Sequence, residues 1–133
     1  MNERLIAFMA KGPGCDKNRG QFNGYVGIRK DIPCIESFMT DLLKYRYDEN
    51  EDLLDKHISI HGGITLDIPA GHFILPRNKI YPITRIPEDI HKNYRILGFD
   101  TNHVDDDCFI WTYDTVREET KNFYNQIKEY LKL

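Results

Sequence analysis

The sequence predicts an α+β fold: a single domain spanning residues 1–133, in which two helices cover one face of a mixed β-sheet. A length of 133 residues with 41% hydrophobic residues suits one globular domain with one core. Short runs rich in β-branched and aromatic residues, separated by turn residues, predict strands. Two segments whose apolar residues recur three and four positions apart predict helices. The predicted order is β, β, α, β, irregular, β, β, α.

The N-terminal third is predicted to contain two strands and the first helix. Residues 5–10 form an apolar run that ends before the turn-forming Gly-Pro-Gly of residues 12–14. Residues 24–29 combine aromatic and β-branched side chains, as strands do. Residues 35–45 form the first helix, because one helical face collects the apolar residues Ile35, Phe38, Met39, Leu42 and Leu43. The acidic residues 47–52 lack the ligand spacing of a calcium-binding EF-hand and are interpreted as a solvated connection.

The middle of the chain is predicted to hold the strands that lead to a site. Residues 58–61 form one strand, and residues 95–100 form another. Between them, residues 66–87 contain four prolines, which exclude a long helix and favour extended pieces and turns that cover or border the site. Residues 108–111 are expected to form a short strand.

The final helix is expected to run to about residue 132. Its buried stripe consists of Val116, Thr120, Phe123, Ile127 and Leu131. Either Thr112 or Thr115 can cap its first turn, and Thr115 with Glu118 fits the Ser/Thr-x-x-Glu capping box.

Composition argues against several classes of partner. A formal net charge of −3 disfavours binding to duplex nucleic acid, and no apolar run approaches the roughly 20 residues that cross a membrane. Aromatic residues make up 12% of the chain and could fill the core, line a pocket or form a homo-oligomer interface. Three widely spaced cysteines argue against a disulfide framework, so we expect a reducing, cytoplasmic location.

Two predicted strand ends carry the residues that suggest chemistry. His61 is followed by two glycines, whose backbone N–H groups a ligand can approach closely. Asp100 and His103 follow the other strand and precede three aspartates, residues 105–107. Because the carboxyl ends of parallel strands gather at one edge of a sheet, we expect His61, Asp100 and His103 to face one cavity. The alternative is ordinary turn chemistry, with the histidines hydrogen-bonded structurally.

A pocket at these strand ends would suit a small polar ligand such as a nucleotide. The aromatic rings of Tyr25 and Trp111 could stack on a base or sugar, although packing in the core would also explain these two residues. The candidate ligand-binding residues are His61, Gly62, Gly63, Thr65, Asp100, His103, Tyr25 and Trp111.

The same residues could hold a divalent metal ion as a cofactor. Imidazole and carboxylate groups bind zinc and similar cations, and the candidate ligands are His61, Asp100, His103 and Asp106. A metal-dependent hydrolase would use the ion to lower the pKa of water, with Asp106 as a general base. No motif for a nucleophilic serine or cysteine is present, so the identity of any other catalytic residue stays open.

Two segments together resemble a group of small phage and prophage proteins. These are His-Gly-Gly-Ile-Thr, residues 61–65, and Gly-Phe-Asp-Thr-Asn-His, residues 98–103. The resemblance implies a phage accessory protein, for which sequestering a signalling nucleotide would be one use, and it carries no known activity with it. A metal-dependent hydrolase and a module that binds a host protein are the alternatives.

Overall fold

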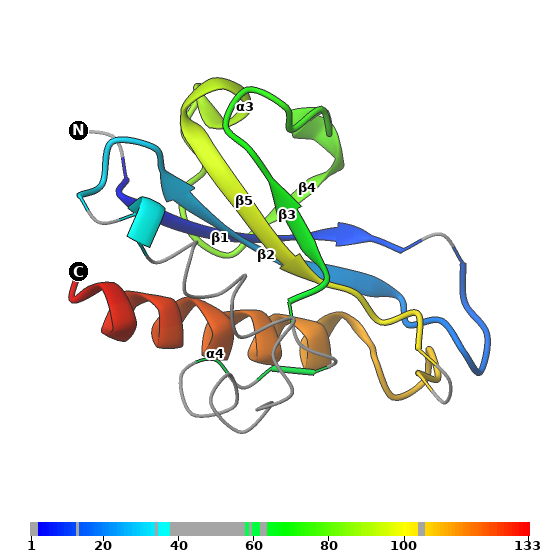
Figure 1. The fold of residues 1–133 in the computed structure, drawn as a ribbon. Coiled ribbons are helices and arrows are strands. Elements are labelled where there is room, and N and C mark those ends of the chain that lie inside the picture. The colour runs from blue at the N-terminus through cyan, green and yellow to red at the C-terminus, as the bar shows by residue number, and fades with distance from the viewer. Residues whose placement is uncertain are drawn as a thin grey trace.

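A computed structural model describes residues 3–12, 14–33, 35–37, 58, 60–61, 64–103 and 106–133. It shows a five-stranded sheet with one long helix lying across one face (Figure 1). The predicted α+β class is therefore confirmed. None of the helices in the described part of the chain is long and apolar enough to cross a membrane.

The sheet is antiparallel at every described pairing, rather than mixed as predicted. Its strands, in the spatial order β3-β5-β2-β1-β4, are β3 (Leu66–Ile68), β5 (Tyr94–Phe99), β2 (Phe22–Arg29), β1 (Leu5–Lys11) and β4 (Ile80–Pro82). Antiparallel neighbours need no crossover helix, and residues 12–21 join the paired strands β1 and β2 directly. The predicted strands at residues 5–10, 24–29 and 95–100 correspond to β1, β2 and β5.

Helix α4 (Tyr113–Leu131) matches the predicted C-terminal helix. The Thr112 side chain caps it by accepting a hydrogen bond from the Thr115 backbone N–H, so Thr112 is the cap and Thr115 lies in the first turn. Four residues of the predicted stripe are buried: Val116, Thr120, Phe123 and Ile127. They pack against side chains on one face of β1, β2 and β5.

Gly24 lets α4 approach this face of the sheet closely. A Cβ atom at Gly24 would lie 2.1 Å from Thr120 Oγ1 and 2.4 Å from the Phe99 ring. Such contacts are far shorter than van der Waals separation, so any larger residue would push the helix away from β2.

The opposite face of the sheet is covered by the proline-containing segment. Phe73 and Ile80 pack there with Phe8 of β1, Ile96 of β5 and Ile90 of the short helix α3 (Ile90–Asn93). The 3-10 helix η1 (Arg77–Lys79) belongs to the same segment. We expected residues 66–87 to cover or border the site. Most of this segment instead buries a second apolar face of the sheet, and only β3 borders the site.

Four other predicted segments differ from the structure or lie at least partly outside the described residues. Residues 35–37 are helical, whereas the rest of the predicted first helix, residues 38–45, and the acidic residues 47–52 are outside the described residues. Residues 58, 60 and 61 are not in a strand, and β3 begins later. The predicted strand at residues 108–111 is a turn, because the Asp107 carboxylate accepts from Phe109 N–H and the Asp107 carbonyl accepts from Ile110 N–H.

Cys15 and Cys108 form a disulfide, so the prediction that the cysteines do not pair is wrong for these two. Their Cα atoms are 5.2 Å apart although 93 residues separate them in sequence. The backbone places them together, because Cys108 N–H donates to the Asp16 carbonyl. An odd number of cysteines excludes a fully paired set but leaves one pair possible.

Candidate functional site

Antiparallel pairing brings the two predicted site segments together. Leu66 at the start of β3 pairs with Gly98 near the end of β5, and Thr65 N–H donates to the Gly98 carbonyl over 2.9 Å. The turn containing His61 therefore lies beside the turn that follows β5. The predicted meeting of the segments is correct, but its predicted cause, parallel strands, is not.

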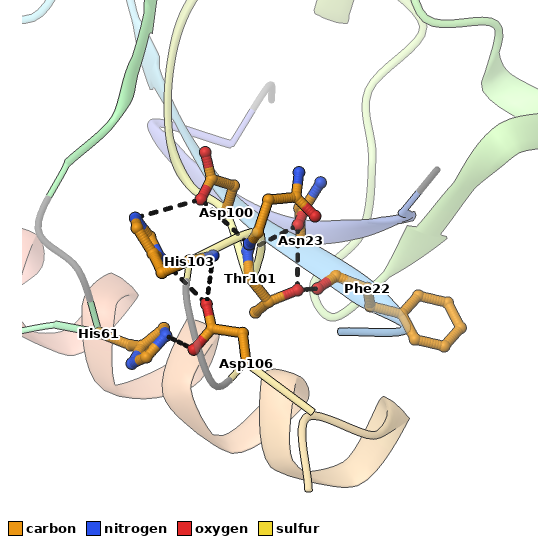
Figure 2. Close-up of polar contacts among 8 residues, drawn as sticks. Phe22, Asn23, His61, Asp100, Thr101, His103 and Asp106 are labelled. Carbon is orange, nitrogen blue, oxygen red and sulfur yellow. Dashed lines mark hydrogen bonds and ion pairs between the residues drawn. The ribbon is translucent and has the colours of Figure 1, made fainter. Parts of the chain in front are cut away.

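Thr101 anchors the turn after β5 to β2. Its backbone N–H donates to Asn23 Oδ1 over 3.0 Å, and its hydroxyl donates to the Phe22 carbonyl over 2.8 Å (Figure 2). Thr101 is fully buried, and its carbonyl accepts from Gly20 N–H. A Cβ at Gly20 would lie 2.3 Å from Thr101 Oγ1, so the loop before β2 fits against this turn only with glycine there.

Asp106 is the centre of the site. One of its carboxylate oxygens lies 2.8 Å from His61 Nε2, and the other lies 2.9 Å from His103 Nδ1 (Figure 2). The second oxygen also accepts the His103 backbone N–H over 2.9 Å. Only 4% of the Asp106 side chain is exposed. The carboxylate is therefore nearly removed from water and is bound on both sides by imidazole rings.

The pKa of Asp106 lies below the ordinary value of an aspartate. Burial alone raises this pKa, but hydrogen bonds from His61 and from the backbone and ring of His103 outweigh burial and lower it. Asp106 is therefore ionised in the neutral pH range. An ionised carboxylate that is buried requires donors or a cation nearby.

Asp100 extends this arrangement on the far side of His103. Its Oδ1 lies 3.4 Å from His103 Nε2 and also accepts the Asn102 backbone N–H. His103 thus has a carboxylate beside each ring nitrogen, and a neutral imidazole can donate to only one of them. The pairing of Asp100 with His103 agrees with the prediction that Asp100 has a partner at this site.

The two aromatic candidates take different positions. The His61 ring lies against Trp111 with ring centroids 3.9 Å apart, so Trp111 supports the histidine. Tyr25 lies on the opposite face of the sheet, where it stacks on Phe8 at 5.1 Å. The structure therefore brings Trp111 to His61 but does not bring Tyr25 there.

The remaining glycine and threonine candidates contribute less to the described geometry. Thr65 is half-buried and its backbone N–H is used by the Gly98 carbonyl. Gly62 and Gly63 lie outside the described residues, as does Asp105.

Three residues are placed to hold a metal ion: His61, His103 and Asp106. One ligand atom from each lies within 4.8 Å of the other two. Zinc bonds of about 2.0–2.2 Å in tetrahedral geometry place ligand atoms about 3.3 Å apart, so a bound ion would replace the shorter contacts of 2.8 and 2.9 Å that join Asp106 to His61 and His103. Asp100 is not in this group and lies behind His103 instead. The predicted four-ligand set is thus reduced to three, with Asp100 as a neighbour of one ligand.

Sequence reasoning missed the residues that hold the site's loops together. Gln21 N–H donates to the Trp111 carbonyl, and the Gln21 side-chain amide donates to the Cys108 carbonyl. The disulfide between Cys15 and Cys108 joins the same two loops. No local sequence pattern marks these contacts, because each connects residues far apart in the chain.

Comparison with protein-family models, with curated proteins and with solved structures finds no match to this chain. The functional argument therefore rests on the geometry of the site.

Proposed function

We propose that this protein is a metal-dependent hydrolase of small polar substrates, with one divalent ion bound by His61, His103 and Asp106. The observation that carries this proposal is the convergence of two imidazoles on one buried, ionised carboxylate, with ligand atoms within 4.8 Å of one another. His61 and Asp106 are 45 residues apart in sequence, so the fold itself assembles this set. Two histidines and a carboxylate match the ligands that zinc and related ions prefer.

The number of ligands favours catalysis over a purely structural ion. Structural zinc sites use four protein ligands, whereas catalytic sites use three and leave a position for water or substrate. When bound, the ion would lower the pKa of water to about 7 and supply hydroxide for hydrolysis. Asp106 would serve as a ligand under this proposal, because both of its oxygens already face the histidines.

Asp100 would act as a positioning residue. A carboxylate on the second nitrogen of a metal-binding histidine fixes the orientation of the ring and raises its basicity. The contact between Asp100 and His103 Nε2 has this arrangement, while His103 Nδ1 faces Asp106 and the ion position. Asp100→Asn should therefore lower metal affinity by about 10- to 100-fold without removing a ligand.

Binding of a small polar ligand without turnover is the second candidate. Both described carboxylates at the site, Asp100 and Asp106, are already paired with histidines, so neither is placed as an obvious general base. A nucleotide-like ligand could then coordinate the ion through its phosphate oxygens.

The cytoplasmic location predicted from unpaired cysteines loses that support, because disulfides persist mainly in oxidising compartments.

A reconstitution assay tests the proposal. Protein purified without a histidine tag would be stripped with a chelator, reloaded with Zn²⁺, Mn²⁺ or Mg²⁺, and assayed against chromogenic phosphate esters, phosphodiesters and carboxylic esters. We expect hydrolysis that depends on one of the ions and is lost in His61→Ala. His72→Ala is the matched control, because His72 is an exposed histidine outside this site.

The assay also separates the two candidates. Stoichiometric metal binding without turnover of any substrate class would favour ligand binding over hydrolysis. Failure of His61→Ala to change metal binding would overturn both.

A further inference from the structure

A second candidate binding site lies at the other edge of the sheet. β4 is the edge strand opposite β3, the strand beside the histidine site. Next to β4 is a pocket of about 220 Å³ lined by Arg77, Ile80, Pro82, Thr84, Arg85 and Ile86. Two of these six residues are arginines, and none is acidic. The pocket therefore has a basic character in a chain whose net charge is −3.

Arg77 is held in a fixed position at this pocket. Its guanidinium donates to the Pro87 carbonyl over 2.6 Å and to the Ile86 carbonyl over 3.1 Å. A guanidinium carries five N–H donors, so further donors remain after these two contacts. Because the partners are neutral carbonyls, the positive charge of Arg77 is not compensated by them. A pre-positioned arginine loses little side-chain entropy when it binds an anion.

Arg85 supplies a second uncompensated charge. Within the described part of the chain, its side chain forms no hydrogen bond or ion pair. Three other arginines of the described residues are paired with aspartates: Arg19 with Asp16, Arg29 with Asp31 and Asp89, and Arg95 with Asp67. The pocket thus gathers two arginines that lack a described acidic partner.

The other lining residues limit what can bind there. The Thr84 hydroxyl accepts from Ala7 N–H and donates to the Arg85 carbonyl, so it is occupied by structural contacts. Ile80, Pro82 and Ile86 provide apolar walls beside the arginines. A volume of 220 Å³ is below the roughly 300–1,000 Å³ of pockets for drug-sized ligands. A single anionic group with a small organic substituent fits this size and chemistry.

We propose that this pocket binds a phosphate group, with Arg77 and Arg85 donating to its oxygens. The planar donor fork of arginine matches phosphate geometry and binds it through paired hydrogen bonds. The apolar walls would contact the carbon atoms of a small phosphate monoester. The pocket is separate from the histidine site, because β3 and β4 are opposite edges of the sheet.

Calorimetric titration of the protein in the presence of a chelator tests this proposal while preventing phosphate from binding through a metal. The probes are inorganic phosphate, glycerol 3-phosphate and glycerol, at constant ionic strength. We expect saturable binding of the two phosphate probes and none of glycerol. Tighter binding of glycerol 3-phosphate than of inorganic phosphate would identify a monoester as the ligand, whereas equal binding would identify free phosphate.

Arg85→Gln should weaken phosphate binding by at least about tenfold, because it removes charge-assisted hydrogen bonds. Arg85 is exposed, so this variant should fold normally. Arg117→Gln, on α4, is the matched control and should bind phosphate as the wild type does. Absence of saturable binding, or equal weakening by Arg85→Gln and Arg117→Gln, would overturn the proposal. Loss of phosphate binding in Asp106→Asn would also overturn it by assigning the phosphate to the histidine site.

Discussion

The sheet with α4 and the turns around Asp106 are stabilised in different ways. Between the sheet and α4, fully buried apolar side chains such as Val26, Phe99 and Phe123 pack together. Around Asp106, the contacts are hydrogen bonds between histidines and a carboxylate, together with a disulfide. The stability of the first region comes from burial of apolar side chains between its own strands and helix. The second depends on a few specific connections between distant residues.

This difference indicates how the protein combines stability with a reactive site. A buried carboxylate is costly unless donors or a cation surround it, so the turns that carry Asp106 gain less from burial. The packed sheet and α4 supply the rigid support from which these turns extend. Substitutions in the core should therefore lower the free energy of unfolding most, whereas substitutions of His61, His103 and Asp106 should affect the site more than stability.

The largest effect should come from Phe123→Ala in the core. Phe123 is fully buried and its ring packs against Phe99 with centroids 6.2 Å apart. Its truncation should lower the free energy of unfolding by about 3–5 kcal/mol, measured by urea denaturation. Phe109→Ala is the control, because Phe109 is 84% exposed, and should change that free energy by less than about 0.5 kcal/mol. Equal effects of the two variants would contradict the assignment of the core.

Breaking the disulfide should have the next largest effect. The bond between Cys15 and Cys108 closes a loop across 93 residues of sequence separation. Cys15→Ser should lower the free energy of unfolding by about 2–4 kcal/mol, and reduction of the wild type should give a similar loss. Cys15 is exposed, so the substitution leaves no cavity. An unfolding free energy that is unchanged by both treatments would show that this bond does not stabilise the loops.

A smaller, pH-dependent effect should come from Asp106. Because the pKa of Asp106 is lower in the folded protein, its ionised form stabilises the fold above the unfolded-state pKa of about 3.9. This contribution is lost as pH falls through the lower, folded-state pKa. Relative to Asp106→Asn, the wild type should lose about 1 kcal/mol of unfolding free energy on acidification below about pH 4. Parallel stability curves for the two proteins would show that the carboxylate is not stabilised by its neighbours.

The elements with a regular apolar pattern could be predicted from the sequence. α4 was predicted from its stripe because one side of the helix packs on the sheet, and β1, β2 and β5 were predicted from their apolar runs. β3 was placed too early, because Ile58 and Ile60 are apolar residues that pack on the core without forming a strand. Burial alone does not distinguish a strand from an irregular segment over so few residues.

The site could be predicted in part. His61, Asp100, His103 and Asp106 were selected from their residue types, and the structure places these four residues in one connected group. The central position of Asp106 among three neighbouring aspartates could not be predicted, since it depends on how one turn folds. The disulfide and the Thr101 contacts with β2 join residues far apart in sequence, and a single sequence contains no local signal for such pairs.

Zinc titration by calorimetry tests the central claim most directly. Chelator-treated wild-type protein should bind one equivalent of Zn²⁺. His61→Ala, His103→Ala and Asp106→Ala should each weaken binding by at least about 100-fold, because each removes one ligand. His72→Ala should bind as the wild type does, since His72 is outside the site. Substoichiometric binding by the wild type, or unchanged affinity in the three ligand variants, would contradict a metal centre at His61, His103 and Asp106.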